Sequence, residues 1–566
     1  MGIPGLFRSC IQKYNESSKD KVIQIDVRNG RNHLFLDFNC AIYYVLKPEM
    51  KTNETLIIHT IEYLDTLCKL IPNLDTVYIA LDGVPPRAKM EQQRSRRFHS
   101  VCKKKKALNI NTKYGNHLDK TNYNFNLDTN MITPGTVFMK ELSLAIRKHL
   151  SDNNFYDNKK IIFSDSSMPG EGEHKILDYI RENNINEDDN IIIYGLDGDL
   201  IMLSLVSQRS NLYLLREAVQ YGGYAKHFEG HKYLFLNIDN LYKSILLEFQ
   251  SSMVFELDYE KGHRYIDDYI FLCFILGNDF VPKIHWYSLY DGGHDKLINI
   301  YFEIHNNTEE FLVDRTNMTI NRIILMDIFQ MLSLNENYAI KKLFKKREKL
   351  RIPVKEDMSE RERQQLLVDF YPLQYLDVEK NIDPYSPKWR QRYYKTCFQF
   401  NNNPDNIKMV TNEYLKTLVW NFHYYFKECP DWDFYYPFHY SPTTADIYYA
   451  IENIKQTDLK KAFDFNKNKP IEPQTLLLMV LPNNSSSLMA IDIHNHLLKG
   501  NEHLSIYFPK KYTLNVAFHK YYYECTANIP KMKTKFIEKF IKDNCKLTND
   551  ELERNKKGEL FIKNKS

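Results

Sequence analysis

The chain has 566 residues, of which 43% are hydrophobic and 26% are charged, a composition typical of a globular protein with two or three domains' worth of core. The formal net charge is only +4, so a role in binding nucleic acid requires a local basic patch rather than overall charge. The sequence contains no apolar run of 18 residues or more, which excludes a membrane-spanning helix. Nine dispersed cysteines without a Cys-x-x-Cys pair predict reduced thiols in an intracellular, soluble protein that lacks a zinc knuckle.

Four short apolar runs in the first 200 residues each end in an acidic residue. They are His33–Asp37, Thr76–Asp82, Lys160–Asp165 and Asn190–Asp197. Runs of this length, rich in Ile, Val, Phe and Tyr, are typical of buried strands. Helical patterns lie between them, for example at residues 54–70 and 135–150. This alternation predicts an α/β fold with a mostly parallel, twisted sheet flanked by helices, in which ligands bind at the carboxyl ends of the strands.

Seven acids form the candidate catalytic and metal site: Asp37, Asp82, Glu171, Glu173, Asp197, Asp199 and Asp279. Four follow strands, one pair begins a helical pattern, and the last lies in a turn after an apolar helix. Any one of them alone is more often a turn or cap residue. Convergence of the whole set requires cations, and carboxylate oxygens select Mg²⁺ or Mn²⁺. Two such ions would serve phosphodiester hydrolysis. Asp267 and Asp268 are interpreted instead as first-turn acids of a helix at 268–276.

A basic helix is predicted at residues 87–106, directly after Asp82. On this helix the side chains of Lys89, Gln93, Arg96 and Arg97 share one stripe, which predicts a phosphate-binding surface beside the metal site. A solvated helix face is the alternative for an arbitrary charge run. The lysines at 103–106 are interpreted as a groove-lining or solvated tract rather than a nuclear signal.

Aromatic residues offer candidates for stacking on bases. Tyr43 lies one helical turn after Asn39, close to Asp37. Trp432 and Phe434 belong to the stretch 432–442, most of which is expected to be core. From about residue 310 the sequence changes character, and residues 340–367 are charged and expected to be helical. The expected organisation is a catalytic domain at 1–310, a second region at 311–545 packed on it, and a polar, frayed tail at 546–566.

Several segments carry a family resemblance. They are MGIPGLFR at the start, LFLDFN (34–39), ALDGVPPRAKMEQQRSRRF (80–98), ITPGTVFMKEL (132–142), PGEGEHKILDYIR (169–181), YGLDGDLIML (194–203) and LGNDFVP (276–282). Further matches lie at 388–395, 432–442 and 477–482. The chain thereby resembles the Xrn-type 5′→3′ exoribonucleases over nearly its whole length. The segments PGEGEHK and DGVPPRAKMEQQR are highly specific for this family.

The resemblance implies a 5′ nuclease (PIN-like) core with a helix-rich second region, and a magnesium site built from the same seven acids. It implies processive hydrolysis of single-stranded RNA to nucleoside 5′-monophosphates and a pocket for a 5′ monophosphate at Lys89, Gln93, Arg96 and Arg97. It also implies a stacked first base, with Tyr43 and Trp432 as the candidates. The usual role of the family is degradation of decapped or cleaved RNA, and the cytoplasm is preferred over the nucleus. Protein partners are not indicated.

The sequence also departs from the family pattern. Tyr43 stands where the family often has a histidine, and Phe434 replaces one of two aromatic residues, so the stacking partner is open between Trp432 and Phe434. We expect neither the long C-terminal extension of the large cytoplasmic members nor the zinc knuckle of the nuclear members. A compact member rich in Tyr, Asn, Lys and Ile, a bias typical of AT-rich coding, suggests a large DNA virus or a protist as the source. The alternatives are a flap-type or DNA-repair 5′ nuclease, and a non-catalytic RNA-binding module, which the intact acids disfavour.

Overall fold

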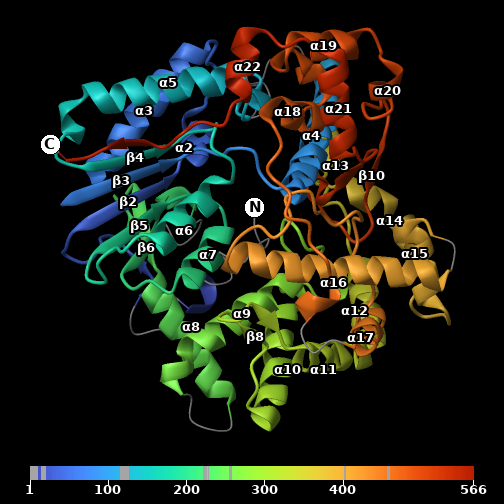
Figure 1. Ribbon diagram of the computed structural model, residues 1–566. Coiled ribbons are helices and arrows are strands. Elements are labelled where there is room, and N and C mark those ends of the chain that lie inside the picture. The colour runs from blue at the N-terminus through green and yellow to red at the C-terminus, as the bar shows by residue number, and fades with distance from the viewer. Residues whose placement is uncertain are drawn as a thin grey trace.

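An eight-stranded sheet forms the centre of the computed structural model, with the strand order β1-β7-β6-β5-β2-β3-β4-β12. The structure describes residues 11–14, 21–114, 126–220, 226, 228–253, 258–400, 403–455 and 459–565. The opening segment MGIPGLFR, which carries part of the family resemblance, therefore lies outside the described residues. The sheet occupies one side of the molecule and the helix-rich second half occupies the other (Figure 1).

Five neighbouring strands of the sheet are parallel: β6 (Leu212–Glu217), β5 (Asn190–Tyr194), β2 (Asn32–Asp37), β3 (Leu74–Ala80) and β4 (Lys160–Ser164). The outer strands β7 (Tyr233–Asn237) and β12 (Phe561–Lys563) run antiparallel to their neighbours, as β1 (Ile23–Gln24) does to β7. The four apolar runs of the sequence are β2, β3, β4 and β5. The prediction of a mostly parallel α/β sheet is confirmed.

Helices cover both faces of the sheet, which explains why its strands are continuous apolar runs. Along β2, Leu34 and Leu36 belong to the core under α3 (Asn53–Leu70) and α5 (Val137–Asp152). The intervening Phe35 faces the core beneath α6 (Gly172–Glu182), α7 (Asp199–Ser207) and α8 (Ile238–Ser252). The short α2 (Asn39–Val45) follows β2 directly. The predicted helices at 54–70 and 135–150 are confirmed as α3 and α5.

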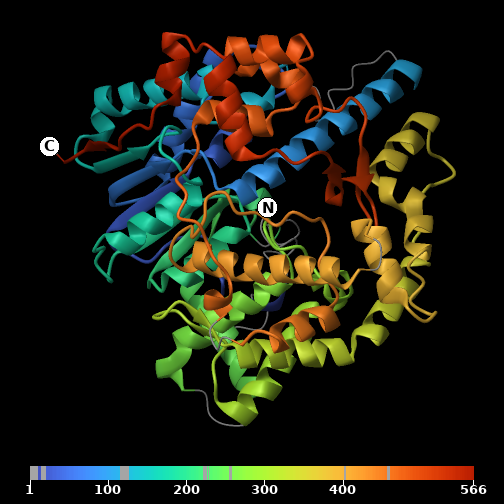
Figure 2. The ribbon, with the colours of Figure 1, turned by 45° about the vertical axis from the view of Figure 1, so that its right-hand side comes forward.

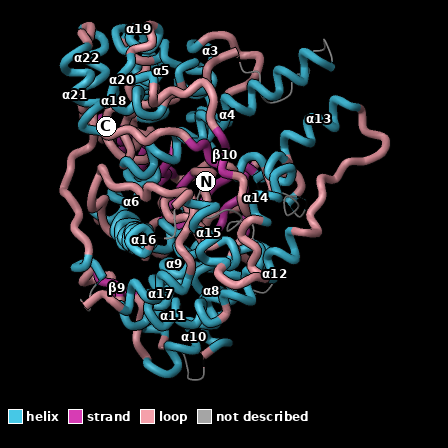
Figure 3. The backbone as a smooth tube through the Cα atoms, turned by 90° about the vertical axis from the view of Figure 1, so that its right-hand side faces the viewer, coloured by secondary structure: helices cyan, strands magenta, loops and turns pink. Residues whose placement is uncertain are grey.

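The 28-residue helix α4 (Arg87–Tyr114) begins beside the sheet and runs outward. Figure 2 shows it extending away from the sheet toward α13 (Glu360–Asp369), and Figure 3 shows α13 beside it from another side. Lys103 lies 3.2 Å from the carboxylate of Asp369, and the ammonium of Lys106 lies 4.4 Å from the ring centre of Tyr371. These lysines therefore pack partly against the second half of the chain.

The second half is mainly helical. Its first helices are α9 (Gly262–Ile275), α10 (Gly293–Thr308), α11 (Arg322–Leu334), α12 (Glu336–Arg347), α14 (Leu376–Lys380), α15 (Trp389–Phe398), α16 (Pro404–Phe426) and α17 (Thr444–Glu452). They share one continuous hydrophobic core with α6 and α7. The charged segment 340–367 is only partly helical, because an irregular stretch separates α12 from α13.

The last helices pack on α4 rather than forming a separate body. They are α18 (Pro473–Val480), α19 (Ile491–Leu498), α20 (Glu502–Ser505) and α21 (Thr534–Asn544), next to a small hairpin of β10 (Thr513–Asn515) and β11 (Thr526–Asn528). Val84, Met90 and Phe98 share a core with α18 and α21. The guanidinium of Arg94, buried on α4, donates to the carbonyls of Met479 and Tyr507.

The expectation of a frayed tail is wrong. Residues 549–555 form α22, capped by Thr548, and β12 then pairs antiparallel with β4 in the register Ile562 to Ile162. Thr548 accepts a hydrogen bond from the backbone of Glu551, which closes a capping box. The polar tail thus completes one edge of the sheet, where β4 would otherwise leave backbone groups unpaired.

The placement of Asp267 and Asp268 in a first helical turn is also wrong, although their structural role is right. Helix α9 begins at Gly262, so both acids lie inside it. Asp268 accepts hydrogen bonds from the Tyr301 hydroxyl and the backbone of Leu312, and Asp267 pairs with Arg315. Among the helices that the structure describes, none combines the length and apolar character needed to cross a bilayer.

Candidate metal and RNA-binding site

Three acids lie at the carboxyl edge of neighbouring parallel strands. Asp37 is the last residue of β2 and pairs in register with Ala80, so Asp82 follows just beyond the adjacent β3. Asp197 follows β5 on the other side of β2. Asn39, at the start of α2, fixes Asp82 from both sides, because its side-chain amide donates to Oδ2 at 2.8 Å and its carbonyl accepts from the Asp82 backbone at 3.1 Å.

The first turn of α6 brings two further acids to this edge. Glu171 is the N-cap and Glu173 lies in the first turn. The backbone N–H of Gly172 donates to Oδ1 of Asp82 at 2.7 Å. A Cβ atom on Gly172 would lie 2.6 Å from Oδ1 of Asp37, so a larger residue here would displace that carboxylate.

Asp199 and Asp279 complete the cluster. Asp199 begins α7, and its backbone N–H lies 3.4 Å from Oδ1 of Asp197. Asp279 follows α9 in a turn that the Asn278 carbonyl stabilises by accepting from the backbone of Phe280 and Val281. The seven acids of the sequence prediction therefore lie on the strand ends, helix starts and turn that the pattern indicated.

The side chain of Lys89 lies at an unexpected position in this site. Its ammonium lies 2.7 Å from Oε2 of Glu171 and donates to Oδ2 of Asp279 at 2.9 Å. The structure thus places Lys89 between the acids, not with Arg96 and Arg97. Its charge offsets part of the repulsion among the carboxylates, and those carboxylates in turn raise its pKa well above the usual value against the opposing effect of burial.

The carboxylates repel one another in a buried setting. Burial and the neighbouring Asp82 raise the pKa of Asp37 to about 7, and burial with Asp197 and Asp279 raises the pKa of Asp199 to about 8. Burial also raises the pKa of Glu173 well above its usual range. Its Oε2 is buried without a hydrogen-bond partner among the described residues. A buried, unpartnered carboxylate oxygen among other acids is what a bound hard cation would satisfy, so the donor set fits divalent metal ions.

Glu171, Glu173 and His174 offer one ligand atom each within 4.8 Å of one another. The ring of His174, however, stacks on Tyr424 with the centroids 3.8 Å apart, and burial holds the pKa of this imidazole well below its usual value. A neutral, stacked imidazole next to the acids is more easily explained as packing than as a ligand, because the acids supply enough oxygen donors.

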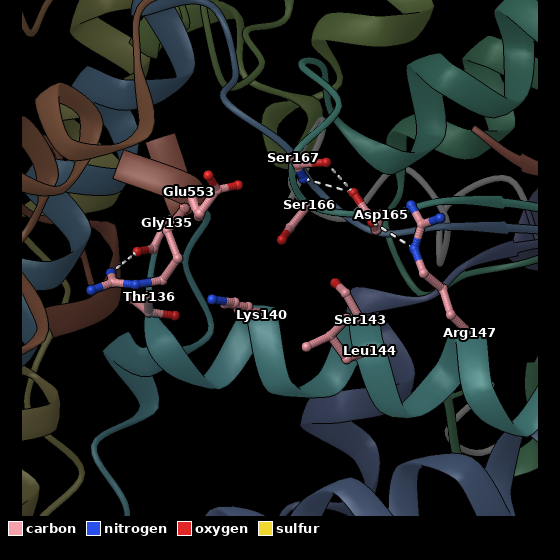
Figure 4. A pocket seen from close by; sticks show the side chains of 11 residues that line it. Gly135, Thr136, Lys140, Ser143, Leu144, Arg147, Asp165, Ser166, Ser167 and Glu553 are labelled. Carbon is pink, nitrogen blue, oxygen red and sulfur yellow. Dashed lines mark hydrogen bonds and ion pairs between the residues drawn. The ribbon is translucent and has the colours of Figure 1, made fainter. Parts of the chain in front are cut away.

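Asp165, which ends the fourth apolar run, does not join the cluster. Its carboxylate accepts from Arg147 at 2.6 Å and from the backbone of Ser167 at 3.0 Å, beside a cavity of about 230 Å³ between α5 and the C-terminal segment (Figure 4). This agrees with its omission from the predicted site.

The remaining residues of the predicted phosphate surface lie on α4. Gln93 is half-buried, Arg96 is exposed and Arg97 is half-buried. The Nη1 atom of Arg97 is buried and has no hydrogen-bond partner in the described part of the chain. Burial lowers the pKa of Arg97 to about 10, and the nearby Tyr43 hydroxyl and Arg96 also act on it. A guanidinium with an unused donor beside a second arginine is suited to bind an anion.

The aromatic candidates for base stacking differ in how far their side chains are exposed. Tyr43 lies on α2 with 49% of its surface exposed, near Arg97. Phe434 is buried in the core, with its ring 6.1 Å from Trp420 and 5.9 Å from Phe465. Trp432 is only partly buried, and its carbonyl accepts from the backbone of Arg87 at 2.8 Å. Of the two alternatives that the sequence left open, Trp432 is the more exposed ring.

Two contacts with the acids were missed by sequence reasoning. The amide of Asn39 bridges to Asp82, and the hydroxyl of Tyr424 on α16 donates to Oε1 of Glu171 at 2.7 Å. Asn39 could have been found, since it follows a strand-end acid by two residues. Tyr424 lies 253 residues from its partner, and no local pattern marks it.

Comparisons with known proteins agree with the geometry. A family model described as the XRN 5'-3' exonuclease N-terminus matches residues 1–218, and a second, described as the Xrn1 helical domain, matches residues 259–383 and 377–566. The first covers most of the sheet and six of the seven acids, and the second covers the helix-rich half, including Asp279 and α16.

Three curated proteins illustrate the similarity. The 5'-3' exoribonuclease 2 homolog of Drosophila melanogaster is 27% identical, over 100% of this chain and 74% of its own length. The 5'-3' exoribonuclease 2 of Gallus gallus is 26% identical, over 94% and 68%. The 5'-3' exoribonuclease 1 of Saccharomyces cerevisiae is 26% identical, over 86% of this chain and 40% of its own length.

Proposed function

Because the chain belongs to the XRN 5'-3' exonuclease family, we propose that it is a 5′→3′ exoribonuclease that degrades single-stranded, 5′-monophosphorylated RNA processively to nucleoside 5′-monophosphates. The observation that carries this proposal is the meeting of seven carboxylates at one sheet edge, directly beside the start of α4. An acid cluster and a basic helix in contact are suited to bind metal ions and a phosphate chain at the same place.

Two divalent cations, Mg²⁺ or Mn²⁺, would be held by Asp37, Asp82, Glu171, Glu173, Asp197, Asp199 and Asp279. When bound, such ions supply an activated water and charge stabilisation at the scissile phosphate. The protein's own contribution is the arrangement of the ligands. Asn39 and the Gly172 backbone fix Asp82, and the start of α6 aims two glutamates at the same place.

The arginines of α4 explain how a 5′ end would be selected. Arg97 offers a buried, unused donor and Arg96 an exposed guanidinium, and Gln93 lies on the same stripe. A 5′ monophosphate bound there would present its first phosphodiester to the acid edge. A 5′ hydroxyl would leave these donors unpaired, and a cap or triphosphate would require more room. Lys89 pairs with Glu171 and Asp279 and would contact phosphate once cations replace it there.

The first base would stack on an aromatic ring. Tyr43, at the exposed end of α2 near Arg97, is the proposed platform on one side, and Trp432 is the second candidate. Stacking accepts every base, because each base has a π-face. This accounts for degradation of RNA without sequence preference.

The test is a time course with three 3′-labelled single strands in Mg²⁺: 5′-monophosphate RNA, 5′-triphosphate RNA and 5′-monophosphate DNA. The matched control protein is Asp199→Asn, which keeps the size of the side chain but removes its charge. We expect rapid loss of the first strand alone, without intermediates, and no loss with the control or with EDTA. The control should still bind the RNA.

Comparable loss of DNA would indicate a broader 5′ nuclease of the flap or DNA-repair type. Loss of the triphosphate strand at the same rate would refute the monophosphate pocket. Undiminished activity of Asp199→Asn would refute the metal site. Binding of RNA without any turnover by the unaltered protein would refute the proposal that the protein is an enzyme.

A further inference from the structure

Helix α16 places one of its faces against the acid site. Figure 1 shows this helix crossing the molecule, with one end beside α7. Trp420, Asn421 and Tyr424 lie at helical spacings of one and four residues, so they project from one side of the helix. All three are buried, and each donates to or accepts from a different segment of the site.

Tyr424 holds Glu171. Its hydroxyl donates to Oε1 at 2.7 Å, while Oε2 of the same carboxylate contacts Lys89. The Tyr424 ring is fixed between the stacked ring of His174, 3.8 Å away, and the ring of Trp420, 4.8 Å away. The hydroxyl position is therefore determined by packing, and it sets the rotation of the Glu171 carboxylate.

Asn421 reaches the turn that carries Asp279. Its Oδ1 accepts from Nδ2 of Asn278 at 3.2 Å. The other end of the Asn278 amide accepts from the backbone of Phe280 and Val281 and so shapes the turn. One amide thus connects α16 to the backbone conformation that aims Asp279 at the cluster. The Nδ2 atom of Asn421 is itself buried without a partner among the described residues.

Trp420 adds a third connection. Its indole N–H donates to the carbonyl of Asp431 at 2.9 Å, directly before the candidate stacking residue Trp432. One side of α16 therefore contacts a metal-ligand candidate on α6, the residue that precedes a second candidate in the turn after α9, and the segment that carries Trp432. Helix α4 reaches the same three segments through the Lys89 ammonium and the backbone of Arg87, whereas α16 reaches them through neutral, buried side chains.

We infer that α16, which belongs to the helical half of the chain, aligns the metal ligands of the site. Tyr424 and Asn421 act as positioning residues for Glu171 and Asp279. The inference rests on the proposed function. Partners that orient ligating carboxylates typically change metal affinity or activity by about 10–100-fold when removed. The predicted consequence is a weaker metal site with intact ligands.

The test measures metal binding directly. Metal-free protein is titrated with Mn²⁺ by calorimetry, and the Mg²⁺ dependence of RNA degradation is measured in parallel. Tyr424→Phe keeps the stacked ring and removes only the hydroxyl. Asn421→Leu keeps the volume and removes the amide contact, together with a buried donor that lacks a partner. The matched control is Tyr414→Phe, which removes a buried hydroxyl from the same helix that has no hydrogen-bond partner in the described structure.

We expect the Mn²⁺ dissociation constant to rise about tenfold or more in Tyr424→Phe and in Asn421→Leu, with Tyr414→Phe unchanged. Saturating Mg²⁺ should restore most of the turnover, and the preference for a 5′ monophosphate should persist. Unchanged Mn²⁺ affinity in both variants would overturn the inference, as would an equal loss in Tyr414→Phe, which would indicate packing alone. If the unaltered protein neither binds Mn²⁺ nor degrades RNA, the proposed function fails together with the inference.

Discussion

The ammonium of Lys89 lies 2.7 Å from Oε2 of Glu171, so a residue expected in a phosphate pocket neutralises a residue expected to bind metal. The side chains are only 10% and 7% exposed. In this arrangement the lysine ammonium compensates part of the carboxylate charge that a metal cation would otherwise compensate. Metal binding and displacement of Lys89 toward a phosphate are therefore expected to be linked events.

Replacing this lysine tests its role in the metal-free protein. Lys89→Met keeps the aliphatic length but removes the charge, which leaves buried carboxylates uncompensated. Breaking a buried pair in this way costs about 3–5 kcal/mol. We expect a clearly lower Tm in EDTA and recovery of most of the loss when Mg²⁺ is added, measured by thermal denaturation.

The control for this variant is Lys105→Met, an exposed position on the same helix. It should leave the Tm within the error of the measurement under both conditions, because isolated surface charges contribute little. An equal Tm for Lys89→Met and the unaltered protein in EDTA would contradict the neutralising role.

The raised carboxylate pKa values predict how metal-free stability depends on pH. Asp37 and Asp199 have pKa values of about 7 and about 8 in the folded protein, against about 4 in an unfolded chain. Between these limits the folded state binds more protons than the unfolded state. The free energy of unfolding in EDTA should therefore be highest near pH 4, about the pKa of these groups in the unfolded chain, and should fall as the pH rises toward about 8.

Thermal denaturation in EDTA at a series of pH values measures this effect, and Asp37→Asn is the informative variant. It removes one of the shifted groups, so the decline of the Tm with pH should become shallower. Excess Mg²⁺ should reverse the trend, since cations bind the ionised carboxylates. A Tm in EDTA that rises from pH 5 to 8, or a slope unchanged in Asp37→Asn, would contradict the assignment.

The unused donor of Arg97 predicts selectivity for the 5′ end. Arg97→Met should reduce kcat/KM for 5′-monophosphate RNA by about 10–100-fold, which corresponds to roughly 1.4–3 kcal/mol for a charge-assisted hydrogen bond. The rate on 5′-hydroxyl RNA should stay nearly unchanged, so the ratio of the two rates should approach one. Competition assays with equal amounts of both strands measure this ratio.

Lys105→Met again serves as the control on α4, because it removes a charge from the same helix at an exposed position. If it lowers the ratio as much as Arg97→Met does, the selectivity comes from general charge and not from a pocket. A full preference for the monophosphate in Arg97→Met would exclude Arg97 from the pocket.

The sequence predicted the strands and the acids because both depend on local pattern. A run such as 190–197 is apolar on both faces, and its strand end fixes where Asp197 must lie. Periodicity also placed Lys89 and Arg97 on one stripe of α4, but it does not reveal what each side chain meets. The ammonium of Lys89 contacts Asp279, which comes from a turn distant in the sequence, so no local pattern reveals this contact. The role of Tyr424 depends on packing between halves of the chain and leaves no local signal.

The C-terminal tail shows the same limit, since polar composition alone suggested fraying. In the structure β12 pairs with β4, and Arg147 reaches from α5 to donate to the carbonyl of Glu559 at 3.0 Å. Pairing depends on the exposed edge of β4, which the tail sequence does not contain. A three-residue strand that exposes Ile562 and ends in Lys563 is short and charged enough for an edge position.

Deleting residues 557–566 tests this edge strand. The deletion removes the ladder with β4 and the contacts of Lys563 with Leu150 and Asp157, at 3.0 and 2.8 Å. A loss on the order of 2–3 kcal/mol follows from a few backbone hydrogen bonds at about 1 kcal/mol each. We expect the Tm to fall by several degrees, while RNA degradation at low temperature continues, because Asp165 at the end of β4 lies outside the acid cluster.

Ile562→Ala, which trims a side chain that is 53% exposed but keeps the backbone, should leave the Tm nearly unchanged. If the deletion leaves the Tm unchanged, the strand contributes nothing to stability, and if Ile562→Ala lowers it equally, side-chain packing rather than the ladder holds the edge.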